Sequence, residues 1–188
     1  MASHRPIPSL KAQALALLAR REYSRSELHK RLLAHARKLA AAAAQVPPVD
    51  PWDHEAAAAQ PTPTPLAEAP SAEALHAEVE AVLDWLAARQ YQSDVRFVEA
   101  RVNARVARHG ERRIRHELAQ HGLALDAETA QQLRSSEVQR AHEVWQKRFG
   151  SIAADAQERE RQMRFLAARG FSAETVRRVV GGRDPDDE

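Results

Sequence analysis

Several residue types that support common kinds of protein chemistry are missing or scarce in this chain of 188 residues. It contains no cysteine, which excludes disulfides, thiolate chemistry and cysteine-bound zinc and is typical of a reducing compartment. Glycine occurs only 6 times and aromatic residues make up 5%, which disfavours a glycine-rich phosphate loop and an aromatic surface for stacking bases. No run of about 18 apolar residues occurs, so we expect no signal peptide, no membrane span and a cytoplasmic protein.

Charge is nearly balanced in total but is unevenly distributed. The chain has 28 basic and 26 acidic residues, and 24 of the basic residues are arginines, whose planar guanidinium suits paired contacts to carboxylates or phosphates. Residues 1–36 carry seven basic against two acidic side chains, and residues 95–121 carry seven against three. Residues 72–94 and the C-terminal tail hold the acidic excess. Such clusters are typical of solvated helix faces as well as of surfaces that bind an acidic partner.

Proline marks where helices are allowed. Seven of the 10 prolines lie between Pro47 and Pro70, and none lies between Ser71 and Asp184. Because proline costs about 3 kcal/mol inside a helix, the proline-free stretch can be helical. Residues 37–70 form an Ala/Pro-rich insertion that we interpret as a linker, except that Leu39–Ala44 is expected to extend the preceding helix.

Apolar residues outside the insertion recur at helical spacing, and no segment alternates as a half-buried strand does. Their stripes, which we expect to form the core, are Leu75/Val79/Val82/Leu83/Leu86, Phe97/Val98/Val102/Val106, Ile114/Leu118 and Val138/Ala141/Trp145/Phe149. We therefore predict an all-α fold of about nine short helices. The expected N-caps are Ser24, in a capping box with Glu27, then Ser93 or Asp94, Asp126 and Ser172; the expected C-terminal stops are Gly110, Gly122, Gly150 and Gly170.

One spacing recurs along the chain and predicts repeated helical hairpins. An aromatic residue is followed by apolar residues at offsets of five and nine positions in Tyr23/Leu28/Leu32 and in Phe171/Val176/Val180, and His109/Ile114/Leu118 keeps the offsets with histidine in the aromatic place. A serine cap directly follows both aromatic residues. We expect the aromatic to pack over a short helix that begins immediately after it, in small units that must stack to bury enough surface.

Four segments, in this order, resemble the motifs of the RecX family, the regulators of the RecA recombinase. They are LLARREYSRSEL at 17–28, WLAARQYQSDVRF at 85–97, RHGERRIRHEL at 108–118 and FLAARGFS at 165–172. This chain departs from the family in two places: Gln90 stands where a glycine is usual, and residues 37–70 are inserted between the second and third helices of the first unit.

The resemblance implies tandem three-helix units, stacked into an elongated curved rod that lies in the groove of the RecA–DNA filament. Its unit boundaries fall at about 1–91, 92–134 and 135–188, the last with an acidic tail. Such proteins limit the ATPase, strand-exchange and co-protease activities of RecA and favour filament disassembly. From the helical stripes and the repeated turns and caps, we expect Tyr23, Tyr91 and Phe171 to be buried at equivalent turns. We expect a monomer.

The arginines of the two basic clusters are the candidate partner-binding residues. Arg101, Arg105 and Arg108 lie at i, i+4 and i+7 and therefore share one face if their helix continues through them. The full set is Arg20, Arg21, Arg25 and Arg31 in the first cluster and Arg101, Arg105, Arg108, Arg112, Arg113 and Arg115 in the second. Their partner could be phosphate or carboxylate; we favour a protein surface with secondary contacts to single- or double-stranded DNA.

Enzyme and metal chemistry find little support in the sequence. The spacing of His109, His116 and His121 does not place all three on one helical face, and with His29 and His35 they form no known ligand pattern, so we expect no metal. No nucleophile motif, P-loop or dinucleotide fingerprint occurs, so we expect no cofactor and no enzyme. The candidate carboxylates are interpreted as caps or arginine partners: Glu27, Asp84, Glu99, Glu117 and Glu143.

Two functions from different classes remain open at this point. The first is modulation of RecA, which predicts tighter binding to the filament than to bare DNA. The second is direct nucleic-acid binding by the Arg101–Arg115 region, which needs no RecA. Binding to single-stranded DNA with and without RecA discriminates them.

Deletion of Val46–Pro70 should leave a folded protein that remains active on RecA, because this segment offers little to bury. Thermal denaturation of the deletion variant and its suppression of RecA-dependent ATP hydrolysis measure the two parts of this prediction. Loss of cooperative melting would show that the insertion is part of the fold.

Overall fold

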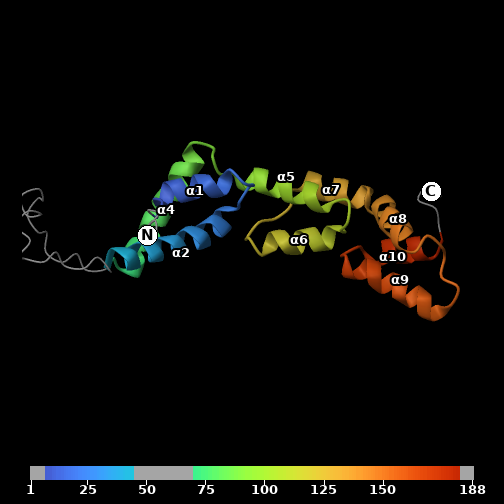
Figure 1. The fold of residues 1–188 in the computed structure, drawn as a ribbon. Coiled ribbons are helices and arrows are strands. Elements are labelled where there is room, and N and C mark those ends of the chain that lie inside the picture. The colour runs from blue at the N-terminus through green and yellow to red at the C-terminus, as the bar shows by residue number, and fades with distance from the viewer. Residues whose placement is uncertain (1–6, 45–69, 183–188) are drawn as a thin grey trace, which may run out of the picture. The chain divides into compact units, whose positions relative to one another are not determined.

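The computed structural model describes residues 7–44 and 70–182, and in these ranges it contains nine α-helices and no strand (Figure 1). The all-α prediction is therefore confirmed. The chain divides into two compact units, Met1–Ser93 and Asp94–Glu188, called here the first and second units.

The first unit is a three-helix bundle. Helices α1 (Leu10–Leu18), α2 (Arg25–Ala44) and α4 (Ala72–Ala88) pack together, and α2 and α4 share the largest contact. Leu28 and Leu32 of α2 are fully buried against the apolar stripe of α4, whose five members are all buried as expected. Helix α2 continues to Ala44, which confirms the extension expected for Leu39–Ala44; residues 45–69 of the insertion lie outside the described residues.

Serine caps begin both long helices of this unit. The Ser24 hydroxyl accepts a hydrogen bond from the backbone N–H of Glu27 (3.1 Å), and the Ser71 hydroxyl accepts one from Ala74 (3.1 Å). Each bond satisfies one of the N–H groups that the first turn of a helix leaves unpaired. Ser24 thus caps α2 as the sequence predicts, while the Glu27 side chain turns to arginines.

The second unit contains two groups of three helices, each around its own apolar cluster. The first group is α5 (Asp94–Arg105), α6 (Glu111–Ala119) and α7 (Ala127–Ser135), and the second is α8 (Glu137–Arg148), α9 (Ala156–Ala168) and α10 (Ala173–Val180). Phe97, Ile114 and Leu118 centre the first cluster, and Leu166 and Phe171 are buried in the second.

A buried arginine joins these two groups. Arg140 of α8 donates from Nη1 to the carbonyl oxygens of Val106 (2.9 Å) and His109 (2.7 Å), and from Nη2 to that of Leu133 (2.7 Å). These carbonyls lie just after α5 and in the last turn of α7, where helix geometry leaves acceptors unpaired. Burial lowers the pKa of Arg140, and the nearby carboxylate of Glu137 opposes that shift.

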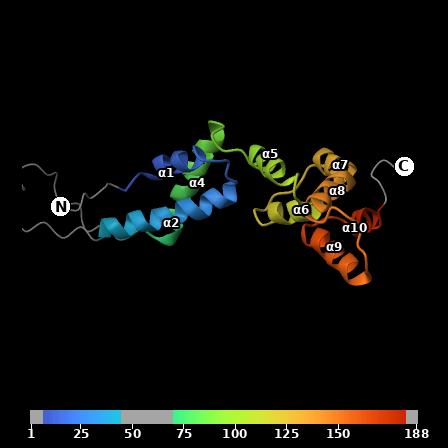
Figure 2. The ribbon, with the colours of Figure 1, turned by 45° about the vertical axis from the view of Figure 1, so that its right-hand side comes forward.

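The same junction, where α6 lies beside α9 (Figure 2), also brings two glycines into backbone contact, as the distances show. The Gly110 N–H donates to the carbonyl oxygen of Arg169 (3.0 Å), and a Cβ on Gly110 would stand 2.3 Å from the carbonyl oxygen of Gly170. Gly170 also has φ +82°, and its own Cβ would lie 2.5 Å from the Arg113 backbone nitrogen. A larger residue at either position would force the two helix groups apart.

Two local expectations from the sequence are corrected at this junction. Gly110 does not stop the preceding helix but forms the N-cap of α6, with φ −75°. Helix α5 ends five residues earlier, at Arg105, and the carbonyls of Val106 and His109 in the following turn accept from Arg140. The other three glycines, Gly122, Gly150 and Gly170, follow helix ends with positive φ, as predicted.

The expectation that three aromatic residues are buried at equivalent turns holds for two of them. Tyr23 is 5% exposed and Phe171 is 1% exposed, each covered by the helix that follows it. Tyr91 is 49% exposed, so its expected burial is wrong. The positions five and nine residues after Tyr91 are Arg96 and Ala100, which offer no large apolar side chain to cover the ring.

Gln90 nevertheless forms the turn expected of a glycine. It takes a left-handed conformation with φ +57°, and the Tyr91 N–H donates to the carbonyl oxygen of Leu86 (2.9 Å). Gly170 makes the same closing pattern after α9, where Phe171 donates to Leu166 (3.4 Å). The substitution keeps the turn at the cost of a conformation that residues with a Cβ adopt reluctantly.

Replacing Arg140 with methionine should lower the free energy of unfolding by about 3 kcal/mol, because it leaves one buried and two partly buried carbonyl oxygens without their donor while keeping an unbranched stem. Urea denaturation followed by circular dichroism measures the change. Arg148→Met is the matched control on the same helix, since Arg148 is exposed; it should stay within about 0.5 kcal/mol of the parent. Equal stability of the two variants would contradict the role assigned to Arg140.

Candidate partner-binding surface

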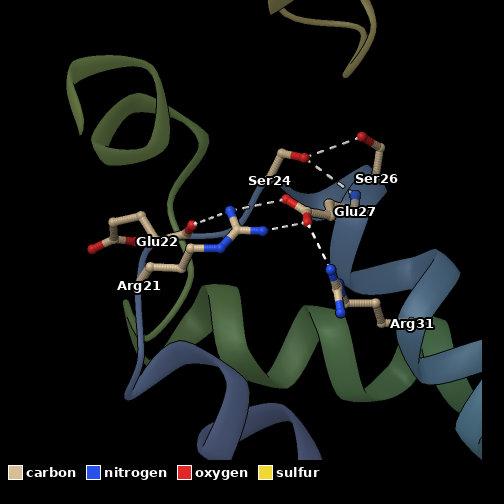
Figure 3. A network of polar contacts seen from close by, with 6 residues as sticks. All are labelled: Arg21, Glu22, Ser24, Ser26, Glu27 and Arg31. Carbon is tan, nitrogen blue, oxygen red and sulfur yellow. Dashed lines mark hydrogen bonds and ion pairs between the residues drawn. The ribbon is translucent and has the colours of Figure 1, made fainter. Parts of the chain in front are cut away.

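Two arginines of the first basic cluster share one carboxylate, that of Glu27 (Figure 3). Arg21, in the turn before α2, donates to both Glu27 oxygens, at 2.5 Å from Nη2 and 3.3 Å from Nη1. Arg31 reaches Glu27 Oε1 from the next turn of α2 at 3.4 Å. Both guanidinium groups also lie over the ring of Tyr23, at 3.9 Å and 5.3 Å from its centroid. These arginines therefore clamp the buried aromatic turn.

Electrostatics support this clamp. Burial pulls the pKa of Arg21 down, but the hydrogen bond and the charge of Glu27 raise it more, so the net pKa lies above its ordinary value. The pair is partly exposed, at 44% for the Arg21 side chain and 17% for that of Glu27. A pair of this exposure adds about 1 kcal/mol or less to stability.

Arg25 ties α2 to α4. It forms an ion pair with Glu80 and donates to Asp84 Oδ1 at 2.7 Å, and its pKa is raised mainly by the bond to Asp84. Arg20 differs from the other three predicted members of this cluster, because it is exposed and has no acidic partner among residues 7–44 and 70–182.

Two arginines of the second basic cluster also share one carboxylate. Glu117 of α6 accepts from Arg105 Nε (3.0 Å) and from Arg113 Nε (3.3 Å), which links the end of α5 to α6. Burial raises the pKa of Glu117, but the charge of Arg105 and the bonds from both arginines lower it more, so it stays ionised to lower pH than usual. In the repeat, Arg113 corresponds to Glu27 and Glu117 corresponds to Arg31. The same two positions thus form an ion pair in both helices, with the acidic and basic residues interchanged.

A second carboxylate, that of the buried Glu111, holds two more arginines. Arg115 pairs with it one turn along α6, and Arg134 of α7 reaches it at 3.2 Å. Arg101 has a different partner, since its guanidinium lies 5.2 Å from the ring centroid of Phe97. Six of the ten predicted arginines thus have acidic partners within the chain, and a seventh contacts an aromatic ring.

Arg108 and Arg112 are the exposed members of the second cluster without an acidic partner among the described residues. Arg108 does not share a helix face with Arg101 and Arg105, because α5 ends at Arg105 and Arg108 lies in the following turn. The single helical face expected for these three arginines is therefore wrong.

Sequence reasoning missed two basic residues that the fold brings near Arg112. Arg134 and Arg178 line, with Arg112, a polar hollow of about 940 Å³ between the two helix groups of the second unit. The buried carboxylate of Glu137 forms part of its wall and accepts from the N–H groups of Glu111 (3.4 Å) and Ser172 (3.3 Å), at the starts of α6 and α10. The adjacent pair Arg177–Arg178 was the one signal of this site in the sequence.

The histidines and remaining carboxylates are spread over separate surroundings. His35 Nε2 lies 2.7 Å from the carbonyl oxygen of Pro8, His121 packs on Phe97, and among the described residues no three His, Asp or Glu side chains form a group that could hold a metal ion. Glu27, Asp84 and Glu117 are arginine partners as predicted, whereas Glu99 has no ion pair among the described residues.

No described helix combines the length and apolarity that crossing a membrane requires.

Comparison with known proteins identifies relatives of both helix groups in the second unit. Residues 93–132 match the model of the second three-helix domain of RecX, and residues 135–180 match that of the third. A protein of Leptothrix cholodnii named "Regulatory protein RecX" is 41% identical over 96% of this chain and 92% of its own length. Proteins of the same name are 39% identical in Ralstonia nicotianae, over 98% and 94%, and 35% identical in Neisseria meningitidis, over 94% and 92%.

Replacing Glu117 with glutamine should destabilise the protein by up to about 1 kcal/mol at pH 7, because the partly exposed pairs with Arg105 and Arg113 are lost. Since the folded-state pKa of Glu117 lies below its ordinary value, its contribution is present above the unfolded-state pKa and fades as the pH falls through the folded-state value. The difference between parent and variant should therefore shrink below about pH 4. Glu99→Gln is the control, and urea midpoints against pH are the measurement; a difference that persists to low pH would contradict the ion-pair explanation.

Proposed function

This chain belongs to the RecX family, and on that premise we propose that it is a modulator, mainly a negative regulator, of the RecA recombinase. In this proposal it binds in the groove of the RecA–DNA filament and limits ATP hydrolysis, strand exchange and co-protease activity. It acts by occupying a surface of the filament, without a cofactor and without catalysing a reaction. Because RecA–DNA filaments form in the cytoplasm, the proposed function places this protein there as well.

The observation that carries the proposal is the presence of exposed arginines whose charge nothing in the described chain neutralises. Arg20, Arg108 and Arg112 can each offer a full guanidinium fork to an acidic partner without first breaking an internal pair. The filament presents both protein carboxylates and DNA phosphates, and an arginine fork binds either group through two parallel bonds.

The paired arginines are less suited to binding a partner. Arg21, Arg25, Arg105, Arg113 and Arg115 each hold an acidic side chain of the chain itself, so an incoming carboxylate or phosphate has to compete with that partner. Exchange of one exposed partner for another changes the free energy little, because surface ion pairs contribute about 0–1 kcal/mol. We therefore assign these residues mainly to the fold and rank the unpaired arginines first for binding.

The double variant Arg108→Ala/Arg112→Ala should keep the melting temperature of the parent within a few degrees but lose much of its effect on RecA. Arginines that become desolvated at interfaces are frequent hot spots, each worth about 2 kcal/mol or more. We expect the concentration that half-suppresses RecA-dependent ATP hydrolysis on single-stranded DNA to rise about tenfold or more.

The matched control is Arg159→Ala/Arg161→Ala, which removes the same charge from exposed positions of α9. It should suppress RecA nearly as well as the parent. Equal losses in both variants would mean that only net charge matters, and no loss in either would show that Arg108 and Arg112 are solvated surface. If the parent itself has no effect on RecA, the proposed function is wrong.

A second candidate function, direct binding of single-stranded nucleic acid, is favoured by one cluster in the first unit. Trp85 and the half-exposed Tyr91 have ring centroids 5.7 Å apart, and the cations of Lys11 and Arg89 lie 5.0 Å and 4.6 Å from the Trp85 ring. Aromatic rings beside cations are a typical stacking surface for unpaired bases. Binding of an oligothymidine as tight without RecA as with it would favour this candidate over RecA modulation.

A further inference from the structure

An apolar groove lies between α5 and α7 in the second unit. Val98 and Val102 of α5 and Leu123, which precedes α7, line it, and Val95 stands at its edge with 68% of its surface exposed. The groove has a volume of about 630 Å³, enough for several side chains of a partner. Val98 and Val102, which the sequence predicts to be core residues, are therefore only partly buried.

The helix group of α5, α6 and α7 is more open than the last group of the second unit. In the first unit α1 packs against α4, and in the last group α8 packs closely against α10. Helices α5 and α7 each pack on α6 but have no comparable contact with each other. The space between the first and third helices, which direct packing fills in the last group, is open here.

The rim of the groove carries charge of one sign. The acidic residues Asp94, Glu99 and Asp126 line it, and no lysine, arginine or histidine does. Asp126 also caps α7 through a 2.7 Å bond from the N–H of Thr129, whereas Glu99 has no ion-pair partner among the described residues. The groove therefore differs in chemistry from the arginine surface described above.

We propose that this groove is a docking site for a basic amphipathic helix of a partner protein. Its floor offers apolar contacts to the i, i+3, i+4 and i+7 anchors of such a helix, and its carboxylates face the lysines or arginines that flank those anchors. The negative rim disfavours nucleic acid, whose phosphates it would repel. The groove contains none of the arginines that we propose to bind RecA, so this proposal can be tested independently of the proposed function.

A fluorescent helical peptide of leucine and lysine, about 14 residues long with leucines on one face, provides a defined probe for this site. A peptide of the same composition with scrambled order has the same charge and no apolar face. Fluorescence anisotropy with the full chain should show that the amphipathic peptide binds about tenfold or more tightly than the scrambled one.

Val95→Lys places a positive charge at the groove edge and should weaken binding of the amphipathic peptide about tenfold or more. Ile152→Lys is the matched control, because Ile152 is 62% exposed, lies outside the groove and gains the same charge. Glu99→Gln should weaken binding less and reduce its salt dependence. Because both lysine variants change exposed side chains, circular dichroism melts should match the parent.

Three results would overturn the proposal. The first is equal affinity for the amphipathic and scrambled peptides, and the second is equal weakening by Val95→Lys and Ile152→Lys. The third is a parent dimer in sedimentation equilibrium that Val95→Lys dissociates, since the groove would then be an interface between two copies of this chain. If a variant such as Arg108→Ala/Arg112→Ala no longer affects RecA but still binds the amphipathic peptide more tightly than the scrambled one, the docking site is supported. The role of the arginines is tested separately, by the effect of that variant on RecA.

Discussion

The buried guanidinium of Arg140 is the interaction on which the second unit depends. One side chain donates to carbonyl oxygens that follow α5 and to one in the last turn of α7, from a helix that belongs to the next three-helix group. Helix ends leave such acceptors unpaired, and burying them without donors is costly. Arg140 therefore links the turn after α5 and the last turn of α7 to the next helix group. A small apolar cluster in each group would not by itself specify that arrangement.

The features around Arg140 depend on the position it sets. Gly110 and Gly170 approach so closely that neither position has room for a Cβ, and Glu137 satisfies N–H groups at the starts of α6 and α10. A carboxylate at two helix N-termini also interacts favourably with both helix dipoles. This junction holds the start of α6 in place, and with it Arg112, which has no acidic partner among the described residues.

The arginines of the two basic clusters differ in whether a carboxylate of the chain lies within reach. Glu27 and Glu117 each gather two arginines around a turn of the repeat, so those arginines hold helices and loops together. Arginines outside the reach of such a carboxylate, Arg20 and Arg108 among them, have no acidic partner among the described residues, and it is these that we propose as the binding residues. The groove between α5 and α7 presents the opposite chemistry, an apolar floor with an acidic rim, and so suits a different ligand.

The sequence by itself determined the features that depend on near neighbours: the all-α fold, the serine and aspartate caps, the extension of α2 to Ala44, the buried turns at Tyr23 and Phe171, and the family. Each follows from helical periodicity or from contacts within about one or two turns. Only the tertiary structure decided where α5 ends, that Tyr91 is exposed, which arginines are paired, and that α5 and α7 leave a groove. These depend on residues distant in sequence, such as Arg140 with Val106 or Arg25 with Asp84, and periodicity within one helix carries no information about such partners.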